Sequence, residues 1–320
     1  MNKDQLPIEN NSRHPRVLVF GGLNMGLITK VTRMPEEGET IRGNEFYASS
    51  GGKGATQAVA ASRNIAEVKM IGKVGDDIFG KSLLDTLNNE NIDTDHIGVD
   101  SIASTGTGVI IVDSSSQNRV IATYGANLKC DYEQLQSVNQ SVEWADILML
   151  QMEIPFELSV QAARIAKANN TTVLLDPAPA SSIQLNEYQY FDVITPNQIE
   201  AEYFTGVKVE DENSAAKAAA ILFDRGIGTV IITVGDQGVY YKTEDESGFV
   251  PAFKIDSIDT TSAGDAFNGA FASCLTKNMS IYDAVRFGCA AGALAVSKKG
   301  VQDSMPYSND IYSFIENYCR

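Results

Sequence analysis

The segment DTTSAGDAFNGAF (259–271) places one carboxylate, Asp265, directly after the small pair Ala263-Gly264 at the expected start of a helix. Ser262 and Asp265 satisfy the [ST]-x-x-[DE] pattern of a capping box, in which the two side chains bond to backbone N–H groups of the first helical turn. The same geometry suits a second arrangement, because N–H groups at a helix start can bind an anion with help from the helix dipole. A carboxylate beside such an anion hole can accept the proton of an alcohol during phosphoryl transfer. The segment alone is compatible with a cap and with a catalytic base.

Two further segments combine polar side chains with a strand end. In TPNQIEAE (195–202), Asn197 and Glu200 lie three residues apart, which puts an amide and a carboxylate on one face of the first helical turn. That pair suits the orientation of a hydrated Mg²⁺ beside phosphates, and it equally suits an N-cap with its capping-box partner. The glycine-bearing turn TVGDQG (233–238) either wraps a nucleotide or begins the hairpin that follows.

A glycine-rich turn and one acidic residue are candidates for binding a small polar ligand. The glycines of YASSGGKGATQAVAA (47–61) would let the N–H groups at 52–55 face a ligand, or would simply allow positive φ at a strand-to-helix turn. Glu153 follows the strand-like run DILML, and ligands of open α/β sheets bind beyond the carboxyl ends of the strands. Glu153 therefore suits a hydroxyl-binding carboxylate, or is a solvated residue at the strand end.

The segment GDDIFGKS (75–82) matches the P-loop pattern GxxxxGK[ST]. A P-loop aims backbone N–H groups and a lysine at phosphates, and Asp76-Asp77 would put two negative charges into that cradle. We therefore interpret the segment as a helix start capped by Asp77 or a neighbour, with Lys81 and Ser82 as ordinary first-turn residues.

The elements that position these residues alternate between short apolar runs and helical segments from Arg16 onward. This alternation predicts an α/β fold with a mostly parallel central sheet flanked by helices. The segment ETIRGNEFYASS and the pair GTGVIIVD and NRVIATYG, joined by the turn SSSQ, break the alternation and predict a small second sheet that forms a lid or an edge interface. We expect a polar tail at 1–15 and one domain at 16–320, with lid strands near 38–50 and 106–125.

After Gly235, the pattern predicts a β-hairpin in GVYYKTEDESGFVPAF and then helices at about 264–277, 281–298 and 309–318. No internal repeat or low-complexity linker interrupts the chain.

Composition narrows the classes of partner. The 25 Lys and Arg against 41 Asp and Glu give a net charge of −16, which disfavours nucleic acid and anionic membranes as partners. The four cysteines, at 130, 274, 289 and 319, lack CxxC spacing and fit reduced thiols in a cytoplasm. The N-terminal segment has no apolar signal-peptide core, and no apolar run reaches the roughly 20 residues of a membrane helix. We expect a soluble, cytoplasmic protein that binds small molecules.

The motifs GGKGATQAVAA, TPNQIEAE, TVGDQG and DTTSAGDAFNGAF occur in the order and with the spacing of the ribokinase-like (PfkB) sugar kinases. The chain resembles this family from about Arg16 to the C-terminus, and DTxxAGDxFxGA is its most specific signature. The resemblance implies an ATP-dependent kinase with a small β-lid over the sugar, often the contact of a homodimer. The family uses no Walker A loop, in agreement with our interpretation of GDDIFGKS.

The resemblance also implies roles for individual residues. Asp265 would be the base that takes the proton of the sugar's primary hydroxyl, and the N–H groups of Ser262, Ala263, Gly264 and Asp265 would form the anion hole. Asn197 and Glu200 would organise Mg²⁺ through water. The implied ATP contacts are Asn197, Thr233, Val234, Gly235, Asp236, Gln237, Gly238, Gly264, Asp265 and Cys289. The implied sugar contacts are Asn24, Gly26, Gly52, Lys53, Gly54, Ala55, Thr56, Glu153 and Asp265. A monovalent cation, K⁺, would be bound largely through backbone carbonyls at Asp259, Thr261, Ala295, Lys298, Gly300 and Ser304.

Two departures from the family pattern concern the sugar. Ribose-binding members typically carry N-x-D where this chain has Asn24-Met25-Gly26, and GGKGAN where Thr56 replaces the last amide. A hydrogen bond to a charged group contributes about 1.5–3 kcal/mol, so the changes would weaken ribose binding by roughly one to three orders of magnitude. The default acceptor is D-ribose, phosphorylated at O5 to ribose 5-phosphate with release of ADP. The alternative is a kinase of the same family for another furanose, a deoxyribose or a nucleoside.

A third hypothesis is a non-catalytic sugar or nucleotide sensor that kept the fold. Asp265 and Gly264 argue against it, because a binding module needs no base at an anion hole.

Overall fold

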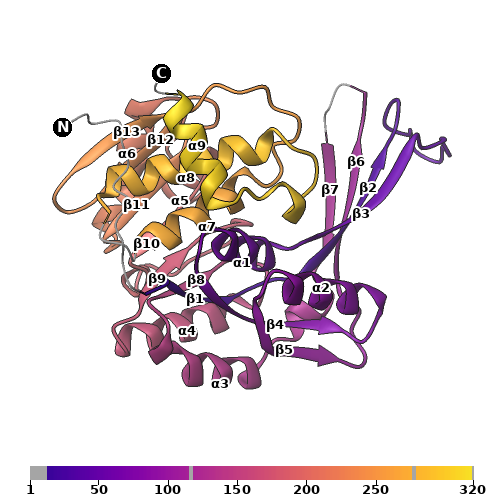
Figure 1. Cartoon of the computed structure of the whole chain (residues 1–320), viewed down its shortest axis with the longest axis horizontal. Helices are drawn as coiled ribbons and strands as arrows, with labels where there is room; N and C mark the ends of the chain where they lie inside the picture. The colour runs from indigo at the N-terminus through magenta and orange to yellow at the C-terminus, as the bar shows by residue number, and fades with distance from the viewer. Residues whose placement is uncertain (1–12, 115–117, 276–278, 319–320) are drawn as a thin grey trace.

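The computed structural model describes residues 13–114, 118–275 and 279–318 (Figure 1). Most of the expected N-terminal tail, residues 115–117 of the SSSQ turn, the end of the helix expected at 264–277 and Cys319 lie outside the described residues.

The central sheet is mostly parallel, as the alternating pattern predicted. Seven neighbouring strands from β11 to β5 run parallel, and the hairpin of β12 and β13 adds two antiparallel strands at one edge. From edge to edge the strands are β13 (Ser247–Pro251), β12 (Gly238–Lys242), β11 (Thr229–Thr233), β10 (Val193–Ile194), β9 (Thr172–Leu175), β8 (Ile147–Leu150), β1 (Arg16–Phe20), β4 (Glu67–Gly75) and β5 (Asp93–Asp100).

Helices cover both faces of this sheet (Figure 1). They are α1 (Lys53–Arg63), α2 (Ile78–Asn89), α3 (Tyr132–Ser141), α4 (Phe156–Ala168), α5 (Gln198–Thr205), α6 (Glu212–Asp224), α7 (Ala263–Leu275), α8 (Ile281–Val296) and α9 (Ser308–Tyr318), with short 3₁₀ turns at Gly125–Lys129, Val142–Trp144, Tyr188–Tyr190 and Gln302–Ser304. Successive residues of β1 enter different cores, because side chains alternate across a strand. Val17 and Val19 pack with α1, α7 and α8, whereas Leu18 and Phe20 pack with α3, α4 and α6.

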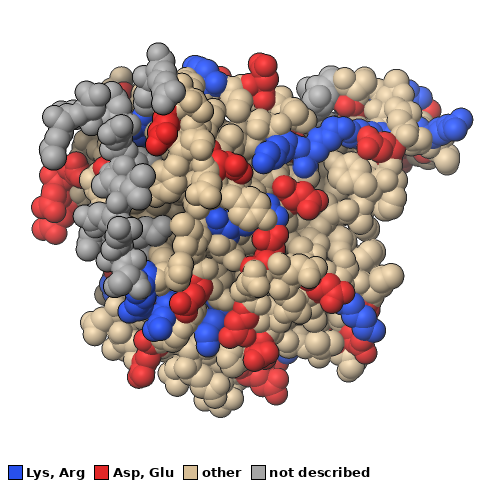
Figure 2. Space-filling view, viewed as in Figure 1, with Lys and Arg blue, Asp and Glu red and all other residues tan. Residues whose placement is uncertain are grey.

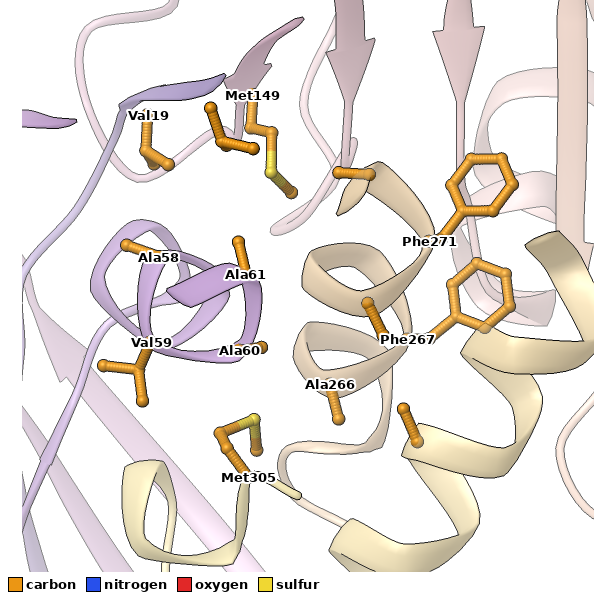
Figure 3. Packing of buried hydrophobic residues seen from close by; sticks show 14 of the residues in the cluster. Val19, Ala58, Val59, Ala60, Ala61, Met149, Ala266, Phe267, Phe271 and Met305 are labelled. Atoms are coloured by element: carbon orange, nitrogen blue, oxygen red, sulfur yellow. The ribbon is translucent and has the colours of Figure 1, made fainter. Parts of the chain in front are cut away.

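Helices α1 and α7 pack closely within the first of these cores, through small residues such as Ala60 and Ala61 on α1 and Ala266 on α7 (Figure 3). Gly269 makes the contact possible, since a Cβ there would lie 2.4 Å from the Cβ of Ala60 and 2.6 Å from the backbone oxygen of Gln57. The helix that follows the glycine-rich turn is thereby held against the helix that carries Asp265.

A separate four-stranded sheet projects from the body of the molecule (Figure 1). Its order is β3 (Glu45–Gly51), β2 (Asn24–Lys30), β6 (Gly106–Val112) and β7 (Asn118–Thr123), and β6 and β7 form the expected antiparallel hairpin. The segment 39–44 contains no strand, so the first lid strand is shorter than expected. The sequence also did not mark β2 as a lid strand, because only three residues separate it from β1 and it resembles a continuation of that strand.

The P-loop match at 75–82 is a capped helix start, as we interpreted it. Asp77 is the N-cap of α2, and its Oδ1 accepts hydrogen bonds from Gly80 N at 2.8 Å and from Thr105 Oγ1 at 2.7 Å. Lys81 is 74% exposed and pairs with Asp76 at the surface. The segment therefore orders the protein's own backbone.

The distribution of charge on the surface and the length of the helices concern two of the expected partners, nucleic acid and membranes. Acidic and basic side chains are interspersed over the face that Figure 2 shows. Within the ranges that the structure describes, no helix is both long enough and apolar enough to cross a bilayer.

Candidate active site

The carboxyl ends of five parallel strands bring several of the predicted site residues to one edge of the sheet. Strand β1 runs into Gly21-Gly22, β8 into Gln151 to Glu153, and β9 into Asp176. Strand β10 leads to Asn197, which forms a parallel bridge with Thr233 at the end of β11. Parallel strands end at the same edge, so segments far apart in the chain meet here.

The glycine-rich turn is joined to Glu153. Gly52 has a φ of 87°, and a Cβ there would lie 2.5 Å from the backbone nitrogen of Asn24, so the turn requires glycine. The backbone N–H of Lys53 donates to Glu153 Oε2 at 2.7 Å, and Asn24 Nδ2 donates to Oε1 at 3.0 Å. The sugar contacts implied by three separate segments therefore lie together around one carboxylate.

The remaining predicted sugar residues lie in α1 and in the lid. Gly54, Ala55 and Thr56 are buried in the first turn of α1, and within the described chain Thr56 Oγ1 has no hydrogen-bond partner. Gly26 lies on the same face of β2 as Asn24, because side chains two residues apart point the same way.

Lys53 is the cation at the centre of a group of buried acids. Its Nζ lies 3.3 Å from Asp176 Oδ2 and 3.9 Å from Asp265 Oδ1. Burial lowers the pKa of Lys53, but the negative charges of Asp176, Asp265, Glu200 and Glu153 outweigh burial and raise its pKa overall. Lys53 therefore stays protonated and compensates several carboxylates at once.

Burial dominates the acids as well. It raises the pKa of Asp265 to about 6 although Lys53 opposes the shift, and Asp176 adds to it. Burial likewise raises the pKa of Glu153 to about 7, against the charge of Lys53 and its N–H. Ionisable groups with pKa values near neutrality in a cleft are typical of functional sites.

The side chain of Asp265 is not used in a capping box. Its Oδ1 accepts from Gln57 Nε2 at 2.9 Å, and Ser262 Oγ is buried without a partner among the described residues. The helical hydrogen bonding begins with Ala266 N, which donates to the oxygen of Ser262 at 3.0 Å. The structure thus decides against the capping alternative and directs the carboxylate to the acid cluster.

Asn197 and Glu200, by contrast, form the capping box that the sequence offered as an alternative to an Mg²⁺ role. Glu200 N donates to Asn197 Oδ1 at 3.0 Å, and Asn197 N donates to Glu200 Oε2 at 2.8 Å. Burial and the charge of Asp176 raise the pKa of Glu200 to about 7. The box therefore also holds Glu200 within the electrostatic influence of the cluster.

A cavity of about 480 Å³ lies against the start of α7, which contributes Ala263, Gly264 and Phe267 to its lining. Six of the implied ATP contacts line it: Thr233, Gly235, Asp236, Gly238, Gly264 and Cys289. Burial raises the pKa of the Cys289 thiol to about 12, so this side chain is neutral. Val234 is buried, and Gln237 Nε2 donates to the oxygen of Glu210, so these two side chains support the loop.

The segments implied for the monovalent cation also lie together. The N–H groups of Ile258 and Asp259 both donate to the oxygen of Val296, at 2.7 and 3.1 Å, which joins the 259–261 segment to the end of α8. Within the 259–261 segment, Thr261 N donates to Asp259 Oδ1 at 3.0 Å. At the end of α8, Lys298 N donates to Ala295 O at 3.1 Å. In the segment that follows, Gly300 has a φ of 102° and Ser304 Oγ donates to Val301 O at 2.8 Å. This cluster adjoins Ala263 and α7 along the chain.

The sequence analysis missed several residues of these sites. Gln57, Gln151 and Asp176 join the acid cluster, and Phe253 and Lys254 line the cavity. Weak signals were present, since Gln57 is one turn after Lys53 in α1 and Asp176 ends the apolar run TVLLD.

The fold and the match to a family model define a carbohydrate kinase. The model of the pfkB family of carbohydrate kinases matches residues 14–307, and the chain belongs to this family. It is accordingly a phosphotransferase that acts on a sugar hydroxyl, which confirms the family resemblance and contradicts the sensor hypothesis.

Relatives within the family carry more specific names. The chain is 40% identical over 299 residues to the ribokinase of Haemophilus influenzae, covering 93% of this chain and 98% of that protein. It is 34% identical over 291 residues to the deoxyribokinase of Salmonella typhi, covering 91% and 95%. The structure of Arabidopsis thaliana ribokinase complexed with ribose and ATP superposes with a TM-score of 0.87 at 28% identity, covering 95% of this chain and 99% of that one.

Proposed function

We propose that this enzyme transfers the γ-phosphoryl group of ATP to the primary O5 hydroxyl of a pentose, with D-ribose as the default acceptor, giving ribose 5-phosphate and ADP. One observation carries the proposal: the start of α7 contributes residues both to the acid cluster and to the lining of the cavity. Asp265 bonds into the cluster around Lys53, while the preceding residues Ala263 and Gly264 line the cavity. An acceptor beside Glu153 and a nucleotide in the cavity would meet at Asp265.

In this proposal Asp265 is the catalytic base. Its raised pKa, about 6, leaves it ionised at neutral pH while making it a stronger proton acceptor than an exposed aspartate. The N–H groups of Ser262 to Asp265 would stabilise the negative charge that develops on the transferring group, helped by the dipole of α7. Glu153 would orient the sugar by accepting hydrogen bonds from its hydroxyls, and Asn24 by donating hydrogen bonds to them.

Mg²⁺ and K⁺ are part of the proposal, and the residues fit them in different ways. No group of three or more His, Cys, Asp or Glu in the described parts of the chain is arranged to hold a metal ion, so Asn197 and Glu200 would hold Mg²⁺ through water. Their capping box uses Oε2 of Glu200, so Oε1 is the oxygen that would face the hydrated ion. Mg²⁺ supplies charge neutralisation on the phosphates. K⁺ would bind the carbonyls around Asp259 and Ala295 and support the position of the adjoining helix start.

The alternative acceptor, a deoxyribose or nucleoside, is favoured by a pair of glycines on neighbouring lid strands. Gly26 pairs with Gly108 on β6, and a Cβ at Gly108 would meet open space. The two adjacent glycines leave this part of the lid without side chains, so the hydroxyls of ribose would lack a carboxylate partner here. The deoxyribokinase of Salmonella typhi is among the relatives of the chain.

A panel of acceptors tests the proposal. ADP release would be measured with Mg²⁺ and K⁺ present for ribose, 2-deoxyribose, other pentoses and nucleosides, and the phosphorylated oxygen would be identified by NMR. We expect a 5-phosphate of one furanose, with ribose as the default. Ordinary ribose turnover would reject the altered-substrate alternative, and the absence of turnover with every pentose and nucleoside would reject the proposed function.

We also propose a homodimer formed through the lid and a reducing, cytoplasmic setting. Phe46 and Ile121 on the lid strands are 66% and 64% exposed, and an apolar sheet face of this kind is typical of an interface. Cys130 and Cys289 are free thiols. Sedimentation of the wild type against Ile121→Asp would test the dimer, and an unchanged mass would reject this contact.

A further inference from the structure

One buried amide, that of Gln57, connects the acids of the site. Its Nε2 donates to Asp265 Oδ1 at 2.9 Å and to Asp176 Oδ2 at 2.7 Å, and its Oε1 accepts from Gln151 Nε2 at 2.7 Å. Gln57 has no solvent-exposed surface. The sequence analysis assigned it no role, and the proposed mechanism above does not use it.

The orientation of this amide is determined by its partners. A glutamine side chain has two N–H donors and one oxygen acceptor, and ionised carboxylates can only accept. If the amide were flipped, Oε1 would face Asp176 and Asp265, and the Gln57 NH₂ group would face the Nε2 donor of Gln151. The observed orientation gives a hydrogen bond to Asp176, to Asp265 and to Nε2 of Gln151, so both N–H groups of Gln57 are committed to the two aspartates.

Two glycines allow the arrangement to form. A Cβ at Gly21 would lie 1.9 Å from Gln151 Oε1, so the glycine after β1 leaves the space that the Gln151 side chain occupies. A Cβ at Gly269 would lie 2.6 Å from the backbone oxygen of Gln57, so the glycine of α7 lets the backbone at Gln57 approach the helix that carries Asp265. The contact is therefore built from two helices and the ends of two strands.

We propose that Gln57 is a positioning residue for the catalytic step: it holds Oδ1 of Asp265 so that Oδ2 faces the acceptor hydroxyl, and Gln151 sets the direction of the Gln57 amide. This inference rests on the proposed function, in which Asp265 is the base. The second N–H of Gln57 links Asp265 to Asp176, so the carboxylate that takes the proton is fixed relative to the acid that pairs with Lys53.

The charges that face Asp265 are those of Lys53 on α1, Asp176 after β9, Glu153 after β8 and Glu200 on α5. The hydrogen bond from Gln57 lowers the pKa of Asp265, against the effects of burial and of Asp176. Removing that donor should therefore raise the pKa of the base further, in addition to freeing its side chain to rotate.

The variant Gln57→Leu keeps the approximate volume of the side chain and removes the amide. We expect kcat to fall by about 100-fold, because small misplacements of a reacting group have effects of that order. The Michaelis constants for sugar and ATP should stay within about threefold, since the residue acts on the transition state through Asp265. The acid limb of the kcat profile should move up by about one pH unit, because one hydrogen bond to a carboxylate is lost.

Two further variants separate positioning from folding. Gln134→Leu is the matched control, because Gln134 is equally a buried glutamine with a hydrogen-bonded side chain but lies at the start of α3. It should leave kcat and the pH profile unchanged, whatever its thermal midpoint. Gln151→Leu should lower kcat by about tenfold in the wild type and have no further effect in Gln57→Leu, since coupled residues are not additive.

The outcomes distinguish this inference from the function on which it rests. Wild-type kcat and an unmoved acid limb in soluble, folded Gln57→Leu would overturn the inference, as would independent effects of Gln57→Leu and Gln151→Leu. If Gln57→Leu does not fold, Gln151→Leu decides alone, and an unmoved kcat there overturns it. Turnover retained in Asp265→Asn would overturn the proposed base itself, whereas loss of turnover in Asp265→Asn with normal glutamine variants would reject only the role of Gln57.

Discussion

Replacing Gly26 with aspartate should convert the lid into a better ribose-binding surface. The position lies on the same face of β2 as Asn24, whose side chain bonds to Glu153, so a carboxylate there would point toward the same ligand. A Cβ at Gly26 would lie 3.3 Å from both Ile28 Cδ1 and Ser49 O. Ile28 Cδ1 is the end of a flexible side chain, whereas Ser49 O belongs to the backbone of β3 and has to shift by a few tenths of an ångström. The φ of Gly26 is not in the left-handed region, so the backbone conformation itself suits any residue.

The size of the effect follows from the hydrogen bonds. A carboxylate that accepts from two ribose hydroxyls gains about 1.5–3 kcal/mol from each bond before any penalty is subtracted. Part of this gain is lost, because a carboxylate is unfavourable in this surrounding: burial raises the pKa of the neighbouring Glu153 to about 7. A net gain of about 1.5–3 kcal/mol corresponds to a KM for ribose that is roughly 10- to 100-fold lower.

The assay is steady-state ADP release with ribose and with 2-deoxyribose at saturating ATP and constant K⁺. The gain should be about tenfold smaller for 2-deoxyribose, because it lacks one of the two hydroxyls. Gly26→Ala is the control, since it introduces the same Cβ contacts without the carboxylate. A KM for ribose that is the same in Gly26→Asp, Gly26→Ala and the wild type would refute the reasoning that the missing carboxylate limits ribose recognition.

Three further predictions concern the base, the helix start at 75–82 and the contact of α1 with α7. Because the pKa of Asp265 is raised to about 6, kcat/KM should rise as the pH increases through 6. Asp265→Asn should raise the thermal midpoint more at pH 7.5 than at pH 4.5, because at pH 4.5 the folded protein still holds that proton and the penalty for ionising the buried carboxyl is only partly present; equal shifts at both pH values would contradict this. Asp77→Ala should lower the free energy of unfolding by about 3 kcal/mol in urea titrations, since it removes a helix cap and the charged hydrogen bonds to Thr105. Lys81→Ala should change neither the stability nor the KM for ATP by more than experimental error. A large loss of ATP binding in Lys81→Ala would restore the P-loop hypothesis. Gly269→Ala should cost about 1–3 kcal/mol of stability through overpacking and should lower kcat by displacing α1 from α7, and wild-type kcat in this variant would show that the close approach of the helices is not needed for catalysis.

Features that depend on neighbours in the chain could be predicted from the sequence. The alternation of short apolar runs with helical segments predicted the α/β sheet, and the two aspartates of GDDIFGKS correctly argued against a phosphate cradle. The capping box of Asn197 and Glu200 could also be predicted, because both residues lie within one helical turn. The family motifs then indicated which of these turns would meet.

Features that depend on distant segments could not be predicted in this way. Gln57 donates to Asp265 and to Asp176, which are 208 and 119 residues away from it in the chain. Strand β2 belongs to the lid because it pairs with β3 and β6. The residue pattern of β2 alone does not indicate this pairing.

Locally, Asp265 suited a capping box and a base equally well, and only the tertiary structure showed that its carboxylate bonds to Gln57 and not within a capping box. Strand order brings the ends of β1, β8 and β9 together, and the absence of side chains at Gly21 and Gly269 lets Gln151 and α7 approach Gln57. The Gln57 amide therefore donates to Asp265 Oδ1, and this carboxylate lies within the acid cluster around Lys53. The sequence by itself determined which residues could do the chemistry, and packing between distant segments determined which of them are placed to do it.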